Sequence, residues 1–171
     1  MNFTVFGCKI KIDFLFVLLL SLSALFSAYS ILYLLLFSFL HEMGHLLALY
    51  IFGGKADSLI FSYYGAALKY QSKLPRAKEF IVLLCGPIVN LIFYLLIRDD
   101  INLVLFILNM LPIYPLDAGR IINLYSFNLS KKLGFVFLFL ISIFAVYLLI
   151  VYKSFSMLLI VVYLIIYSIN Y

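Results

Sequence analysis

The two histidines of this chain, His41 and His45, lie four residues apart, and Glu42 directly follows the first, in the stretch SFLHEMGHLLALY. On a helix, residues four apart share one face, so both imidazoles can reach one metal ion. Zinc binds neutral imidazole nitrogen and keeps an open position for water in catalytic sites. Glu42 then lies beside that water, in the HExxH arrangement. The alternative is a hydrogen-bonded histidine pair, but costly ionisable groups in an apolar segment favour the metal.

A third ligand is needed, because a catalytic zinc usually has three from the protein, and no third histidine exists. Among the seven carboxylates, Asp117 stands out in LNMLPIYPLDAGR. Pro112 and Pro115 each remove a backbone donor and end a helix. Non-helical backbone at membrane depth is tolerated where it lines a cavity, so Asp117 can turn towards the metal. The alternative is a solvated carboxylate at a helix end near Arg120.

Two amides lie in apolar segments near these residues. Asn90 closes the stretch LCGPIVN, and Asn109 lies one turn before the first of the two prolines. A buried amide needs a hydrogen-bond partner. Each could hold a substrate carbonyl or bond a neighbouring helix, and the sequence leaves both open.

The elements that carry these residues belong in a membrane. The 171 residues are 67% hydrophobic and 11% charged, and the mean hydropathy is +1.22. A water-soluble domain cannot bury so much apolar surface. The apolar runs are continuous rather than alternating, which predicts helices. We expect an all-α polytopic membrane protein of about six transmembrane helices, at 14–29, 31–52, 79–97, 101–116, 133–152 and 154–170.

The basic residues predict the orientation. With a cytoplasmic N-terminus, ten of the twelve Lys and Arg residues lie inside, and only Arg98 and Lys153 lie outside. The net charge of +5 then reflects topology and contact with anionic lipid, not nucleic acid. His41 lies about 15 Å from the inner end of its helix. The site should therefore open to the cytoplasmic side.

The longest polar stretch, residues 53–79, predicts a small cytoplasmic β-hairpin after the second helix. Strands at 59–63 and 67–70 would flank a turn at Tyr64–Gly65. The alternative is a loop lying on lipid.

Three motifs together resemble the signatures of the site-two protease family of intramembrane zinc metalloproteases. They are HEMGH at 41–45, GPIVN at 86–90 and NMLPIYPLDAGR at 109–120. The stretches KIKIDF, GGK and LPIYPLD further resemble the stage IV sporulation protease FB branch. The resemblance covers about residues 9–120, and the later segments match only as hydrophobic segments.

The resemblance implies that zinc is bound by His41, His45 and Asp117, that Glu42 is the catalytic glutamate, and that Asn90 and Asn109 contact substrate. It implies one membrane-embedded protease domain over 1–171, with a catalytic core at about 9–120 and accessory helices at about 133–170. The expected activity is regulated intramembrane proteolysis, the hydrolysis of a peptide bond in or near a membrane segment.

The expected partners are a membrane-associated protein substrate, the lipid bilayer and inhibitory membrane proteins, without nucleic acid. A substrate helix must unwind before cleavage, and the 53–79 hairpin could accept it as an added strand. The alternative function is a catalytically inactive metal-binding membrane protein or a small transporter. A transporter should show an internal repeat, which the sequence lacks.

Two departures from the family pattern bear on activity and substrate. The family usually has Asp-Gly-Gly where this chain has Asp117-Ala118-Gly119. If the first glycine needs a positive φ, alanine is strained there. The sporulation branch also typically carries a nucleotide-sensing domain after its last helix, and this sequence shows none up to Tyr171. A sporulation sigma-factor precursor is therefore a weaker expectation for the substrate.

Overall fold

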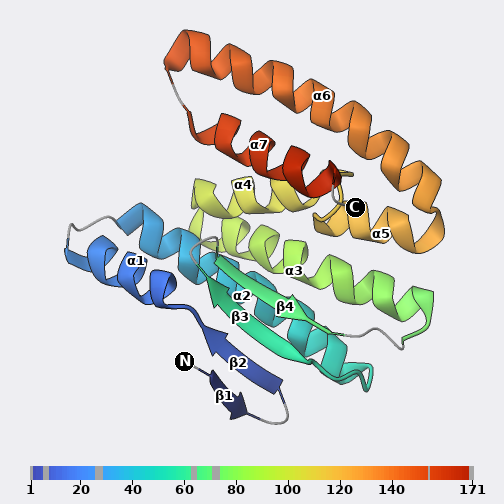
Figure 1. Cartoon of the computed structure of the whole chain (residues 1–171). Helices are drawn as coiled ribbons and strands as arrows, with labels where there is room; N and C mark the ends of the chain where they lie inside the picture. The colour runs from blue at the N-terminus through green and yellow to red at the C-terminus, as the bar shows by residue number, and fades with distance from the viewer. Residues whose placement is uncertain are drawn as a thin grey trace. The chain divides into compact units, whose positions relative to one another are not determined.

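The computed structural model describes residues 2–5, 8–25, 29–62, 65–70, 74–153 and 155–169. They form two compact units, Met1–Ile107 and Leu108–Tyr171 (Figure 1). Each unit has its own hydrophobic core. The expectation of one domain over 1–171 stays a prediction.

The first unit is built on two long apolar helices, α2 (Tyr29–Ile51) and α3 (Arg76–Ile97), which pack against each other. A Cβ at Gly44 would lie 2.8 Å from the Cys85 carbonyl oxygen, so this glycine lets the helices approach closely. Helix α1 (Phe14–Leu25) precedes them, and α4 (Asp100–Asn109) follows and ends just past the unit boundary.

A four-stranded sheet of order β1-β2-β3-β4 packs through β4 against α2, near the end of the helix that the sequence predicts to be cytoplasmic. The expected hairpin is confirmed as β3 (Ser58–Ser62) and β4 (Gly65–Lys69), which are antiparallel. The expected turn residues 63 and 64 lie outside the described residues. Strands β1 (Asn2–Val5) and β2 (Cys8–Ile12) were not expected, and β2 pairs in parallel with β3. Alternation of lysine and isoleucine in KIKI suits a half-buried strand.

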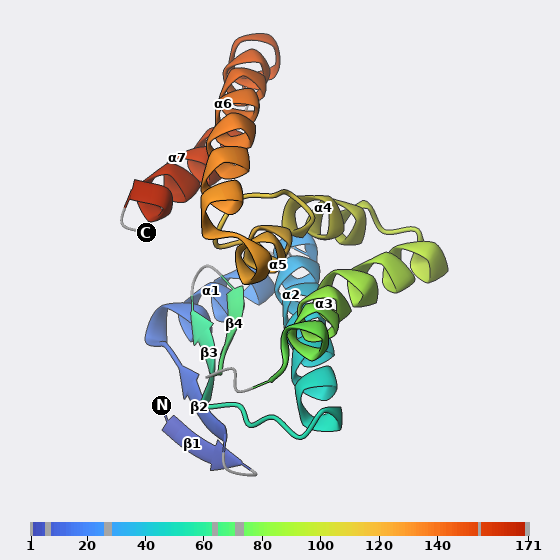
Figure 2. The ribbon, with the colours of Figure 1, turned by 90° about the vertical axis from the view of Figure 1, so that its right-hand side faces the viewer.

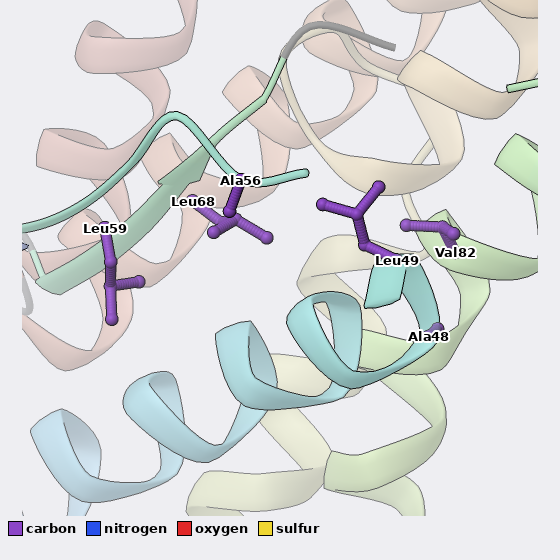
Figure 3. Close-up of a cluster of buried hydrophobic side chains, with 6 residues drawn as sticks. All are labelled: Ala48, Leu49, Ala56, Leu59, Leu68 and Val82. Carbon is purple, nitrogen blue, oxygen red and sulfur yellow. The ribbon is translucent and has the colours of Figure 1, made fainter. Parts of the chain in front are cut away.

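The sheet packs on α2 through one apolar face. Leu59 of β3 and Leu68 of β4 are cross-strand partners, and both are buried. Figure 3 shows this cluster, to which α2 contributes Ala48 and Leu49 and α3 contributes Val82. These contacts fix β4 beside the part of α2 that carries the histidines.

The second unit contains α5 (Asp117–Tyr125), α6 (Phe127–Tyr152) and α7 (Ser156–Ile169). Helices α6 and α7 lie side by side (Figure 2). Its core joins Ile113, from the non-helical segment before α5, to Leu138 and Leu164. The Ser130 hydroxyl donates to the Gly119 carbonyl over 3.1 Å and links α6 to α5.

The helices correct some of the expected spans. Among the described residues, α2, α3 and α6 are long and apolar enough to cross a membrane, and three apolar helices are shorter. The expected helix 101–116 is wrong at its end, because α4 stops at Asn109, before the first proline. Helix α5 was not expected. The chain is an integral membrane protein in character, and the count of about six spans stays a prediction.

Candidate metal centre

His41 and His45 converge on one point. Both imidazoles are buried, and their Nε2 atoms lie 3.1 Å apart. Two imidazole nitrogens bound to a tetrahedral zinc at about 2.0–2.1 Å would be separated by about 3.3 Å. The pair on α2 therefore already has close to the spacing that zinc requires.

Hydrogen bonds behind the rings determine which nitrogens face that point. His45 Nδ1 lies 2.8 Å from the Val82 carbonyl oxygen and donates to it, which places the ring's lone pair on Nε2. His41 Nδ1 lies 3.2 Å from Asn90 Nδ2, while Asn90 Oδ1 is buried and has no hydrogen-bond partner among the described residues. Turning the side-chain amide of Asn90 by half a turn lets Oδ1 accept from His41 Nδ1. Both Nε2 atoms then suit metal binding.

Gly86 of α3 makes room for the imidazoles. A Cβ there would overlap His45 Nε2 and lie 2.8 Å from His41 Nε2. Only glycine lets α3 pass this close to the two nitrogens. Sequence reasoning assigned no role to Gly86 beyond its place in the GPIVN motif, because a close contact between two helices is not visible in one short stretch.

Glu42 lies on the same turn of α2 and is half-buried. Its Oε2 accepts a hydrogen bond of 3.0 Å from the main-chain N–H of Leu68 on β4. The sheet thus contacts the glutamate expected to act as general base. Sequence reasoning missed this contact, because every residue except proline has a main-chain N–H and the residue type does not show which one donates.

Asp117 belongs to the second unit, where it is the first residue of α5. Its side chain is buried, which argues against the alternative of a solvated carboxylate. Arg120, one turn along, has its Nη1 atom 3.6 Å from Asp117 Oδ1. A carboxylate in the first turn also interacts favourably with the helix dipole.

The residues around Asp117 settle the question raised by Ala118. Among the described non-glycine residues, positive φ occurs at Arg98 and Lys153, so Ala118 is not strained in this way. The demand for glycine falls on Gly119, where a Cβ would overlap the Ile113 backbone. The structure therefore accommodates the departure from Asp-Gly-Gly.

The sequence-predicted site residues divide between the units. His41, Glu42, His45 and Asn90 lie in the first unit, where Asn90 contacts His41. Asn109, the last residue of α4, and Asp117 lie in the second.

The chain is similar to known proteins in fold and in sequence. The solved structure of a site-2 protease from Methanocaldococcus jannaschii superposes with a TM-score of 0.67, covering 99% of this chain and 94% of that chain at 20% identity. The chain has the fold of a site-2 protease. A protein named as a zinc metalloprotease from the same organism is 28% identical over 161 residues.

That sequence match spans 78% of this chain but only 46% of the relative, so the chain covers less than half of the relative's length. No protein-family model matches the sequence. Homology to a site-2 protease supports the family resemblance drawn from the motifs. The sporulation branch is not confirmed.

Proposed function

We propose that this protein is an intramembrane zinc metalloprotease that hydrolyses a peptide bond in or near a membrane segment of a protein substrate. One observation carries the proposal: the Nε2 atoms of His41 and His45 lie 3.1 Å apart and are buried, next to a glutamate on the same helical turn. The homology to site-2 proteases supports it.

The residues that would hold zinc are His41, His45 and Asp117. Two imidazole nitrogens and one carboxylate oxygen form a donor set that suits catalytic zinc. Asn90 supports this set, because its otherwise unpaired Oδ1 can accept from His41 Nδ1 and orient the ring. When bound, zinc would acidify a water molecule and polarise the scissile carbonyl.

The protein's own groups would move the proton and hold the substrate. The Glu42 carboxylate would take a proton from the attacking water and then give it to the leaving amine nitrogen. With Oδ1 engaged by His41, the Asn90 amide keeps its N–H groups for a substrate carbonyl. Asn109 is proposed as a second substrate contact by its match to the family motif.

The substrate would be a membrane-associated protein that reaches the site from the cytoplasmic side. Strand β4 ends the sheet order, so its outer edge suits pairing with an unwound substrate segment. The stretches KIKIDF, GGK and LPIYPLD support the sporulation protease branch as the finer assignment, with a sigma-factor precursor as one substrate. Inhibitory membrane proteins would act on the same site.

Co-expression with tagged single-span membrane proteins tests the proposal. The parent chain should produce a shorter tagged fragment on a gel, whereas Glu42→Gln should yield none while purified protein still binds zinc. Equal fragments from both chains, or purified parent protein unable to bind zinc, would show that this is not a metalloprotease.

A further inference from the structure

The outer edge of β4 presents the main-chain groups of Leu68. The Phe61 carbonyl bonds the Asp13 N–H on the β2 side, so Phe61 and, two residues earlier, Leu59 direct their main-chain groups towards β2. Leu59 is the cross-strand partner of Leu68. Because the main-chain N–H and C=O of Leu59 point away from β4, Leu59 and Leu68 are a non-hydrogen-bonded pair. The main-chain N–H of Leu68 therefore points away from β3. Ala66, two residues earlier on β4, faces the same way.

The N–H of Leu68 is the group that donates to Glu42 Oε2 over 3.0 Å. The buried packing of Leu68 and Leu59 against Leu49 holds β4 at this distance from α2. A peptide that adds to the outer edge of β4 needs the same N–H for its own carbonyl oxygen. Glu42 and an incoming strand therefore compete for one donor.

We propose that Leu68 is a positioning residue whose main-chain N–H holds Glu42 in a resting position. An extended peptide segment that pairs with the outer edge of β4 takes over this N–H and releases the carboxylate to act as base. The inference rests on the proposed function and adds to it a coupling between substrate pairing and the readiness of Glu42.

Leu68→Pro removes the contact together with the buried leucine side chain. Proline lacks the N–H, and it is tolerated where that N–H points off the edge of a sheet. Leu68→Ala keeps the N–H and serves as the control for the lost buried side chain. Ala66→Pro removes an outward N–H that does not contact Glu42.

A spectroscopic test reports on the contact without requiring activity. The chain has two glutamates, so Glu79→Gln leaves Glu42 as the single labelled carboxylate in ¹³C-glutamate protein. In lipid-reconstituted protein labelled with both ¹⁵N-leucine and ¹⁵N-alanine, so that residue 68 is labelled in the parent and in Leu68→Ala, the Glu42 carboxyl should show dipolar dephasing by the residue 68 amide. The dephasing should persist in Leu68→Ala and Ala66→Pro and disappear in Leu68→Pro. Its absence in the parent, or persistence in Leu68→Pro, would disprove the contact even if cleavage occurs.

A kinetic test distinguishes a resting contact from a working one. With a membrane substrate that the parent cleaves, Leu68→Pro should raise KM by about fivefold, the worth of one hydrogen bond, and leave kcat at or above that of Leu68→Ala. Ala66→Pro should raise KM similarly. A fall in kcat at unchanged KM in Leu68→Pro would show that the N–H holds Glu42 in its working position and would overturn the proposal.

Discussion

At the residue scale, the two histidines depend on hydrogen-bond partners of different kinds. His45 donates to the main-chain carbonyl of Val82, which no substitution at that position removes. His41 contacts the side chain of Asn90, which can be removed. The orientation of His41 is therefore the part of the site that mutation can test most directly.

Asn90→Ala should weaken zinc binding by about 10- to 100-fold, because His41 loses the partner that fixes its ring and tautomer. Competition with a chromophoric chelator measures the affinity. Asn102→Ala is the matched control, since Asn102 is an equally buried amide on α4. If both variants bind zinc as the parent does, Asn90 does not orient a ligand.

Gly86→Ala should abolish stoichiometric zinc binding. The added methyl group would occupy the space of His45 Nε2, so the imidazoles or α3 must shift, at a cost of about 1–3 kcal/mol. Elemental analysis of purified protein gives the zinc content. Gly134→Ala is the control, because its Cβ would meet the nearest atom at an ordinary 3.6 Å. Full zinc content in Gly86→Ala would mean that the two nitrogens do not bind the metal.

The sequence predicted the residues whose chemistry is in their side chains. The spacing of His41 and His45 identifies a shared helix face at once, because the helical period is local. The role of Gly86 depends on where α3 passes α2, and the contact at Leu68 depends on strand register. Neither is encoded within a short stretch of sequence.

At the element scale, the hairpin β3–β4 was predictable and the rest of the sheet was not. The hairpin strands are neighbours in sequence, and the second begins with a glycine. Strand β2 instead pairs in parallel with β3 across α1 and α2. Helix α5 was missed because Pro112 and Pro115 mark where helices end and do not show where the next one begins.

Leu49→Ala should destabilise the packing of the sheet on α2 by about 2–4 kcal/mol, since a buried leucine leaves a cavity. Leu49 is 1% exposed, whereas Leu47 on the same helix is 65% exposed. Leu47→Ala is therefore the control, with an expected change within about 0.5 kcal/mol. Thermal unfolding in one detergent compares the two. A smaller effect at Leu49 than at Leu47 would contradict the packing seen in Figure 3.

At the scale of the whole molecule, each unit contains a long apolar helix with charges at both ends. Helix α3 begins with Arg76 and Lys78 and is followed by Arg98. Helix α6 carries Lys131 and Lys132 in its early turns and is followed by Lys153. In both helices the N-terminal end is the more basic. The positive-inside rule therefore predicts a cytoplasmic N-terminal end for each helix independently.

Cysteine labelling tests this orientation in cells. In a chain whose Cys8 and Cys85 are replaced by serine, single cysteines at the exposed positions Arg98 and Lys153 should react with a membrane-impermeant maleimide in intact cells. Cysteines at Lys55 and Lys132, which are also exposed, should react only after permeabilisation. The opposite labelling pattern would show that the protein is inserted in the opposite orientation. Strand β3 begins just after Lys55 and its hairpin partner β4 contacts Glu42, so the side of the membrane on which Lys55 reacts is the side on which we expect the proposed site to open.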